Sequence, residues 1–220
     1  MQRNVLITGA TGMIGGLVLE HCLAEPTIKQ VTSLVRRPSG ISHDKLQEIL
    51  VPDFMDLSAC RDVLAETDLV FYCLGTYTGS VSADDMRRTT VDMPAHLAEL
   101  LEQAGARPRF CLLSGAGADR REKSRAAFAR DKGAIENILT KAGFSSFHTF
   151  RPSYIYPVTP RQEPNLSYRL MRAAWPLIRL LGDGMSIPST ELAKAMVHVG
   201  LNGHDKEILE NRDIRRCLPR

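Results

Sequence analysis

Short apolar runs alternate along this chain with longer amphipathic stretches. The short runs are rich in β-branched residues, and most end close to a glycine, proline or serine, which is typical of buried strands followed by turns. They predict strands at residues 5–7, 31–35, 51–56, 68–74, 110–113 and 147–150. The longer stretches predict helices over residues 14–24, 84–104 and 124–142. This alternation predicts a doubly wound α/β fold, a parallel sheet that helices cover on both faces.

The pattern contains no internal repeat and no linker, so we expect one domain over residues 1–220. Residues 157–185 interrupt the alternation and are interpreted as a small lid or substrate-side insertion. Within them, a predicted amphipathic helix at 166–181 carries an arginine stripe formed by Arg169, Arg172 and Arg179. A lid with a solvated arginine face is favoured, and a surface for a membrane or a protein partner is the alternative. A last helix is expected to begin with Ser189 or Thr190 as its N-cap.

Composition narrows the functional classes. The chain has 28 Lys and Arg against 25 Asp and Glu, a net charge of +3 without a basic tail, so we expect no nucleic-acid partner. The five cysteines and six histidines have no metal-ligand or disulfide spacing, which predicts no metal site and a reducing compartment. No signal peptide and no apolar stretch of roughly 18 residues is found, and we therefore expect a soluble, cytoplasmic protein.

The first predicted strand runs directly into the pattern Gly9-x-x-Gly12-x-x-Gly15, and a helix follows. In such a turn the first glycine permits the bend and the second lets the backbone approach a pyrophosphate. The third glycine lets the helix pack closely against the sheet. Amide groups at the helix start, around Thr11, Met13 and Ile14, would face the anion. The strand before the turn and the helix after it favour dinucleotide binding over a purely structural turn.

The ends of the next predicted strands suggest which dinucleotide binds. Arg36 and Arg37 stand where an acidic residue would recognise the ribose of NAD(H), and a guanidinium suits a 2′-phosphate, which favours NADP(H). By the rule that ligands bind beyond the carboxyl ends of strands, we expect further contacts after the third and fourth strands. The candidates are Asp56 and Leu57 at the adenine, and Leu74, Gly75 and Thr76 beneath the ribose and diphosphate. Each of these could equally be part of an ordinary turn.

Several short segments are spread over nearly the whole chain: ITGATGMIG (7–15), YCLGT (72–76), SGAGAD (114–119), KGAIE (132–136), RPS (151–153) and EILEN (207–211). In these segments and in their order the chain resembles the short-chain dehydrogenase/reductase superfamily. More narrowly, it is similar to the atypical members in the Tat-interacting protein 2 group. The resemblance implies a Rossmann-like fold and a nicotinamide dinucleotide, with Pro152 and Ser153 among its contacts.

The resemblance also implies a catalytic set, a serine after the fifth strand and a Tyr-x-x-x-Lys on the following helix. By position, Ser114 takes the serine role and Lys132 the lysine role, at the nicotinamide ribose, but Phe128 occupies the tyrosine position. Phenylalanine cannot donate a proton, and a positioned general acid contributes on the order of 10²–10⁴-fold in rate. The substitute acids considered are Tyr77, Tyr154 and Tyr156.

Two functions follow from these residues. One is NADPH-dependent reduction of a small carbonyl compound, with Ser114, Lys132 and a substitute acid. The other is a non-catalytic NADP(H)-binding regulatory or assembly protein, which Phe128 favours. The substrate is not identified, and both a monomer and a dimer are compatible with the sequence.

Overall fold

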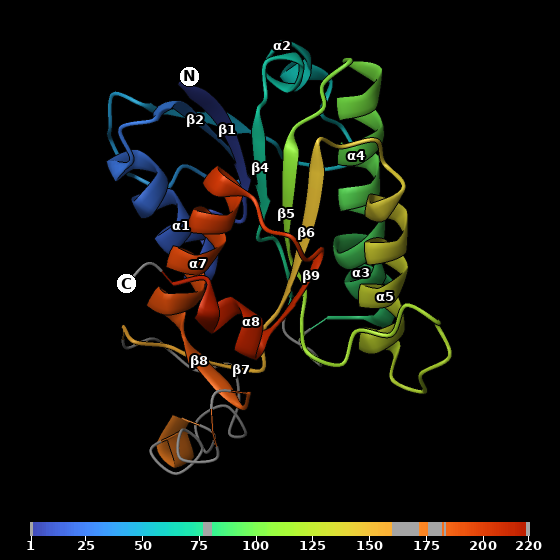
Figure 1. Ribbon diagram of the computed structural model, residues 1–220. Helices are drawn as coiled ribbons and strands as arrows, with labels where there is room; N and C mark the ends of the chain where they lie inside the picture. Colours follow the sequence, from blue (N-terminus) through green and yellow to red (C-terminus); the bar gives the residue numbers. More distant parts are fainter. Residues whose placement is uncertain (1, 77–80, 160–171, 176–181, 183, 219–220) are drawn as a thin grey trace.

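A computed structural model describes residues 2–76, 81–159, 172–175, 182 and 184–218. Its main sheet has seven strands, all parallel, in the order β3-β2-β1-β4-β5-β6-β9 (Figure 1). The strands are β1 Arg3–Thr8, β2 Ile28–Val35, β3 Leu46–Leu50, β4 Leu69–Tyr72, β5 Arg109–Leu113, β6 Ser146–Arg151 and β9 Ile208–Glu210. The predicted doubly wound parallel fold is confirmed.

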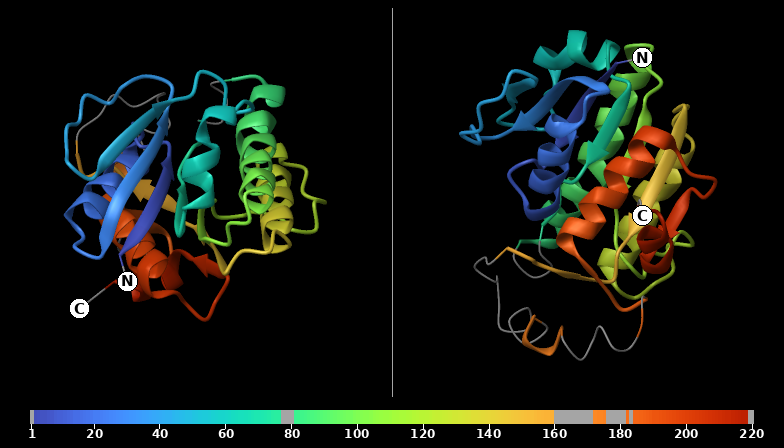
Figure 2. Two further views of the ribbon diagram at one scale, coloured as in Figure 1. Left: turned by 90° about the horizontal axis from the view of Figure 1, so that it is seen from above. Right: turned by 60° about the vertical axis from the view of Figure 1, so that its left-hand side comes forward.

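Helices cover both faces of this sheet. On one face lie α1 (Met13–Ala24), α7 (Ser189–Asn202) and α8 (Asn211–Arg216). On the other lie α2 (Arg61–Ala65), the continuous helix formed by α3, η2 and α4 (Ala83–Arg87, Arg88–Asp92 and Met93–Gln103), and α5 (Ala127–Thr140). Figure 2 shows from above that α1 and α7 lie across the sheet from α4 and α5. No helix in the described part of the chain has the length and apolar character needed to cross a membrane.

Each strand contributes to two cores because successive side chains point to opposite faces. In β4, Leu69 and Phe71 belong to the core beneath α1 and α7, whereas Val70 and Tyr72 belong to the core beneath α4 and α5. All four side chains are at most 2% exposed. This double burial explains why the central strands are continuous apolar runs.

Beyond the carboxyl ends of the main strands, β7 (Tyr154–Tyr156) pairs in parallel with β8 (Ser186–Pro188). In the chain these two strands lie immediately before and after residues 157–185, the segment that was predicted to form a lid (Figure 1). Of the helix predicted at 166–181, only 172–175 lies within the described residues, and it is helical there. The rest of that prediction, including Arg169 and Arg179, falls outside them.

The prediction of a third strand at 51–56 is wrong. The strand is Leu46–Leu50, and residues 51–56 form the loop that follows it, in which Asp53 accepts hydrogen bonds from the backbone of Met55 and Asp56. β3 is an edge strand whose side chains are exposed or only partly buried, so polar residues interrupt its apolar ones and it lacks a buried-strand pattern.

Two helix starts also differ from the prediction. The helix expected from residue 124 begins at Ala127, because Asp119 accepts the Ser124 amide in the preceding loop. The N-cap of α7 is Pro188, not Ser189 or Thr190. The Ser189 hydroxyl instead accepts a hydrogen bond from the Val158 amide at 3.2 Å.

Candidate dinucleotide site

After β1 the chain continues to β2 and β3 on one side of β1, whereas β4 lies on the other side. A crevice therefore opens between the carboxyl ends of β1 and β4. A cavity of about 500 Å³ lies there. Its lining comes from the glycine turn and from the segments after β2, β3 and β4. The lining residues are Gly9, Thr11, Gly12, Leu34, Val35, Arg36, Arg37, Pro38, Ser39, Phe54, Cys73, Leu74 and Gly75.

Close backbone contacts require glycine at Gly9 and Gly15 and leave little room for a side chain at Gly12. Gly9 has φ +76°, and a Cβ there would lie 2.7 Å from the carbonyl group of Cys73. A Cβ at Gly15 would lie 2.1 Å from the Gly9 oxygen, and one at Gly12 would lie 3.1 Å from the same atom. The Gly12 amide donates to the Gly9 oxygen at 2.9 Å, which closes the turn. The turn therefore brings backbone, without side chains, to the cavity.

Helix α1 begins at this turn with its amides directed at the cavity end. Gly12 is the N-cap, and no side chain caps the helix. Its first turn has no acidic residue, and Met13 and Ile14 are its first two residues, so the positive end of the helix dipole meets no carboxylate of its own. A helix start with these features suits a phosphate anion.

Arg36 and Arg37 follow β2 and line the same cavity, and both are exposed. Within the described residues, neither guanidinium has an acidic partner. Glu48 on β3 pairs with neither arginine within these residues, and its carboxylate instead accepts a hydrogen bond from the Ser39 amide at 3.1 Å. The cavity wall after β2 is therefore cationic.

Asp56 and Leu57, expected at the adenine, are not among the lining residues. Leu57 is 2% exposed in the hydrophobic core. Hydrogen bonds from the Ser58 side chain and from the Ser58 amide, the latter at 3.2 Å, hold the pKa of Asp56 below its usual value. Phe54 lines the cavity after β3 instead. It was missed because it fell inside the incorrectly predicted strand.

Leu74 and Gly75 line the cavity as expected, whereas Thr76 is exposed outside its lining. Cys73, directly after β4, also lines it and was not singled out from the sequence. Its side chain is partly buried, and desolvation raises its pKa to about 12, so its thiol stays protonated at neutral pH. In this position it acts as a small apolar wall residue.

Ser114 and Lys132 come together at the end of β5, but the serine hydroxyl already has an acceptor. Ser114 is 8% exposed and donates to Glu136 Oε1 at 2.7 Å. Lys132 is also 8% exposed, and its Nζ donates to the Leu113 oxygen at 3.2 Å. Burial lowers the pKa of Lys132 to about 8, although Glu136 and Cys73 act in the opposite direction.

Phe128 lies on α5 one turn before Lys132, so the two side chains share a helical face. Lys132 Nζ is 6.0 Å from the centre of the Phe128 ring. The ring also reaches the residue next to Ser114, because a Cβ at Gly115 would lie 3.0 Å from Phe128 Cζ. The ring therefore lies beside both Lys132 and Gly115, where it presents no hydroxyl.

Glu136 is the centre of a buried ionic network that the sequence did not assign to a role. It is fully buried and also accepts from Thr149 Oγ1 at 3.0 Å, Arg151 Nε at 3.0 Å and Arg120 Nε at 2.9 Å. Burial raises the pKa of Glu136, but hydrogen bonds from Arg151, Ser114 and Arg120 outweigh this and hold the pKa below its usual value. The carboxylate is therefore charged at neutral pH.

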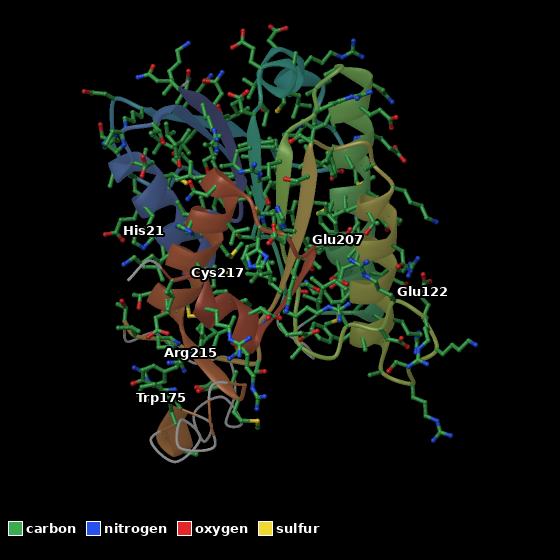
Figure 3. All side chains as sticks on the ribbon, in the orientation of Figure 1. His21, Glu122, Trp175, Glu207, Arg215 and Cys217 are labelled. Carbon is green, nitrogen blue, oxygen red and sulfur yellow. The ribbon has the colours of Figure 1, made fainter. Side chains whose placement is uncertain are left out.

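The network continues to the tail of the chain. Arg120 Nη2 lies 2.7 Å from Glu207 Oε1, and Arg151 Nη1 donates to Glu210 Oε1 at 3.1 Å (Glu207 is labelled in Figure 3). The segments 132–136, 151–153 and 207–211, which carried the resemblance in sequence, thus meet around one carboxylate. These three segments are therefore held together by one ionic network, a contact that the fold shows and the sequence alone does not.

The residues after β6 mainly connect the main sheet to β7 and β8. Pro152 is buried, and its carbonyl accepts the Ala116 amide at 2.9 Å. The Ser153 hydroxyl donates to the Gly184 oxygen at 2.7 Å. Both residues therefore have structural contacts of their own, and the predicted cofactor contacts of Pro152 and Ser153 stay predictions.

The three tyrosines considered as substitute acids lie in different surroundings. Tyr156 stacks on Trp175 with ring centres 3.8 Å apart, at the end of the molecule beyond the carboxyl edge of the sheet (Figure 3). Tyr154 lies on β7 and is partly buried. Tyr77 falls outside the described residues. No three His, Cys, Asp or Glu side chains in the described part of the chain gather as a metal site would require.

Comparisons with known proteins agree with this geometry. A model of a family described as NAD(P)H-binding matches residues 9–200. The rat protein HTATIP2 is 28% identical over 218 residues, which cover 97% of this chain and 88% of the rat protein. The protein FMP52, mitochondrial, of Saccharomyces cerevisiae is 26% identical over 225 residues, 96% of this chain and 94% of the yeast protein.

Solved structures show the same fold at low sequence identity. Gre2 of Candida albicans in complex with NADPH has a TM-score of 0.72 at 16% identity, covering 94% of this chain and 77% of that one. MoeE5 in complex with UDP-glucuronic acid and NAD has a TM-score of 0.70 at 22% identity, covering 93% and 74%. The expected resemblance to atypical short-chain dehydrogenases/reductases is confirmed by these matches together.

Proposed function

This chain belongs to the NAD(P)H-binding family, within the atypical short-chain dehydrogenase/reductase-like proteins, and on that premise we propose that it is an NADPH-dependent reductase of a small carbonyl compound. The observation that carries the choice of NADPH is the pair Arg36 and Arg37, which line the glycine-turn cavity and have no acidic partner among the described residues. Two guanidinium groups favour a ligand with a 2′-phosphate over one with a 2′-hydroxyl.

The residues present fit a dinucleotide. A Cβ on Gly9 or Gly15 would collide with backbone, and Gly12 starts an uncapped helix, so the turn leaves its amides accessible to a diphosphate. The cavity of about 500 Å³ accommodates the adenosine half, with Phe54 and Leu74 as apolar walls. When bound, NADPH supplies a hydride to a carbonyl carbon.

The chain's own residues would bind the nicotinamide ribose, contact the substrate oxygen and exclude water. We propose that Lys132 holds the nicotinamide ribose and that Ser114 lies next to the reacting oxygen, as the resemblance implies. The hydrogen bond from Ser114 to Glu136 sets the orientation of the serine hydroxyl. Phe128 contributes an apolar surface that excludes water next to Lys132.

A second candidate is a non-catalytic NADP(H)-binding protein whose cofactor orders a surface for a partner. Phe128 favours it, because the tyrosine position has no acid. The Ser114 hydrogen bond to Glu136 favours it as well, because the serine hydrogen already has an acceptor. This candidate predicts tight cofactor binding without turnover.

Calorimetry with both cofactors tests the choice of dinucleotide. Replacing Arg36 and Arg37 together by alanine should weaken NADPH binding by about 10–100-fold, because hydrogen bonds to a charged group contribute about 1.5–3 kcal/mol. NADH binding should change by less than about twofold by the same reasoning. Arg61→Ala, at an exposed arginine on α2 outside the cavity, is the matched control. Equal losses for NADPH and NADH would remove the 2′-phosphate assignment.

A turnover assay separates the two candidate functions. NADPH oxidation is followed with a panel of aldehydes, ketones and quinones, with the Ser114→Ala variant alongside. Carbonyl-dependent oxidation that is slower in Ser114→Ala supports the reductase. NADPH affinity with no turnover on any carbonyl supports the non-catalytic protein instead.

Two broader expectations also belong to the proposal. We propose that residues 157–185 cover the substrate side, which is supported by the pairing of β7 and β8, the strands immediately before and after them, at the carboxyl edge of the sheet. A cytoplasmic location is supported by five free cysteines. Cell fractionation tests it against the mitochondrial location in the names of the fungal relatives.

A further inference from the structure

The proposed reductase needs a proton for the substrate oxygen, and the structure accounts for the hydrogens at the three family positions. Phe128 has none to give. The Ser114 hydroxyl has one, which it donates to Glu136 Oε1 at 2.7 Å. That carboxylate is fully buried and charged, so the bond is charge-assisted and the hydrogen is held away from a substrate.

Lys132 differs from both. Its ammonium group has three N–H hydrogens, and one is donated to the Leu113 oxygen at 3.2 Å. No second acceptor meets Nζ within the described part of the chain. Of the three positions, Lys132 alone thus has N–H or O–H hydrogens without an acceptor, and it lies beneath the Phe128 ring at the end of β5.

Within the described residues, the charged and titratable groups around Lys132 come from its own helix and from three neighbouring segments. Glu136 is one turn further along the same helix, and its negative charge is shared with Arg151 from β6 and Arg120 from the loop before α5. Directly after β4, Cys73 is close enough to Lys132 to influence its charge and is a neutral thiol, because desolvation raises the pKa of Cys73 to about 12. Since two arginines already neutralise Glu136, burial outweighs its influence on Lys132 and lowers the pKa of the amine to about 8. An acid with a pKa near the working pH is well matched to proton transfer.

We propose that Lys132 is itself the proton donor to the substrate oxygen, in the role that a tyrosine at position 128 would have had. The inference rests on the proposed reductase activity. As a hydride reaches the carbonyl carbon, the C=O π bond breaks toward oxygen, and that oxygen takes a proton from Lys132 Nζ. The products are an alcohol, NADP⁺ and a neutral amine, which regains a proton from water.

The first test measures the amine without any cofactor. Side-chain ¹⁵N-lysine NMR of the folded protein, with the Lys132 signal assigned by its loss in Lys132→Arg, should give a pKa of about 8. An exposed lysine ordinarily has a pKa of about 10.4. The other lysines in the same spectrum serve as the internal reference. A Lys132 signal that titrates with the ordinary lysines would overturn the proposal.

The second test uses the pH dependence of kcat/KM for NADPH-dependent carbonyl reduction. Because the acid must be protonated, activity should fall tenfold per pH unit above about pH 8. Lys132→Arg keeps a cation for the ribose but does not release a proton in this range, so its kcat should drop by on the order of 10²–10⁴-fold and its high-pH decline should disappear. NADPH affinity should stay within about tenfold, which calorimetry measures. Lys132→Met, which has no charge, is the second variant if arginine does not fit.

The outcomes separate this inference from the reductase itself. Turnover in the unmodified protein that survives in both Lys132 variants, with the same pH decline, leaves the reductase standing and overturns the role of Lys132. The same holds if Tyr154→Phe, and not a Lys132 variant, removes the pH decline. NADPH binding without turnover on any carbonyl removes the reductase, and the role of Lys132 with it.

Discussion

Replacing Gly15 by alanine tests the close packing of α1 on the glycine turn. A Cβ at Gly15 would lie 2.1 Å from the Gly9 oxygen, whereas real Cβ atoms essentially never come nearer than 3.0 Å to such a neighbour. The helix and the turn must therefore separate by at least 0.9 Å, the difference between the two distances. The neighbour is a backbone atom of the turn, so no side-chain rotation can relieve the contact.

The energetic cost follows from two opposing effects. Overpacking typically destabilises a protein by about 1–3 kcal/mol, and alanine in place of glycine returns up to about 1 kcal/mol of helix propensity. Because the 2.1 Å contact with backbone places the overpacking cost in the upper part of its range, the net loss is about 1–2 kcal/mol, which lowers Tm by about 2–8 °C for a chain of this length. Because the shift displaces the turn that would hold the diphosphate, NADPH affinity should also fall by at least about tenfold.

Gly16→Ala is the matched control, since the neighbouring glycine lies in the same helix. Its Cβ would be 3.1 Å from the Ala10 oxygen, a contact that relaxes by a few tenths of an ångström. Thermal unfolding followed by circular dichroism and calorimetry with NADPH compare the three proteins. A Gly15→Ala variant as stable and as tightly binding as Gly16→Ala would refute the reasoning.

Three further predictions concern buried groups. Glu136→Gln should lower the free energy of unfolding by about 3–5 kcal/mol at pH 7, because Arg151 would lose a buried charged partner. The pKa of Glu136 is lowered from 4.5 in the folded state, so this contribution is present above about pH 4.5 and is lost as pH falls through the folded pKa. In urea titrations the two proteins should therefore converge in acid, and a gap that persists there would contradict the assignment. Gly200→Ala should cost about 1–3 kcal/mol, because its Cβ would lie 2.5 Å from Cζ of the fully buried Phe71, and an unchanged Tm would show that the ring can move aside. The Cys73 thiol should resist iodoacetamide at pH 8 until urea unfolds the chain, because burial raises its pKa to about 12, and mass spectrometry of rapidly labelled folded protein would reveal the contrary.

The amino-acid sequence alone was sufficient for the glycine turn and the sheet around it. A tight turn between a strand and a helix depends on residues close together in the chain, here from Gly9 to Gly15. Central strands buried on both faces, such as β4, also have a strong local pattern. For this reason local patterns predict both the parallel fold and the binding of a nicotinamide dinucleotide, and both predictions are confirmed.

Weaker local patterns led to errors at the edge of the sheet. The edge strand β3 is half-exposed, so its sequence Leu46–Leu50 mixes polar and apolar residues, while the loop after it contains the apolar residues Val51, Phe54 and Met55. That error shifted attention to Asp56 and Leu57 and away from Phe54, which lines the cavity. Burial, which depends on neighbouring strands, decides between such segments.

What only the tertiary structure decided is the direction of individual hydrogens and charges at the end of β5. Ser114, Glu136 and Arg151 come from a strand end, a helix and another strand, and no spacing in the chain reports that they meet. Where they meet, the serine hydrogen is donated to Glu136, and the positive charge of Arg151 balances the negative charge of the Glu136 carboxylate. Within the described residues, long-range packing thereby leaves Lys132 as a buried amine that has N–H hydrogens without an acceptor. The sequence showed only that a tyrosine was missing.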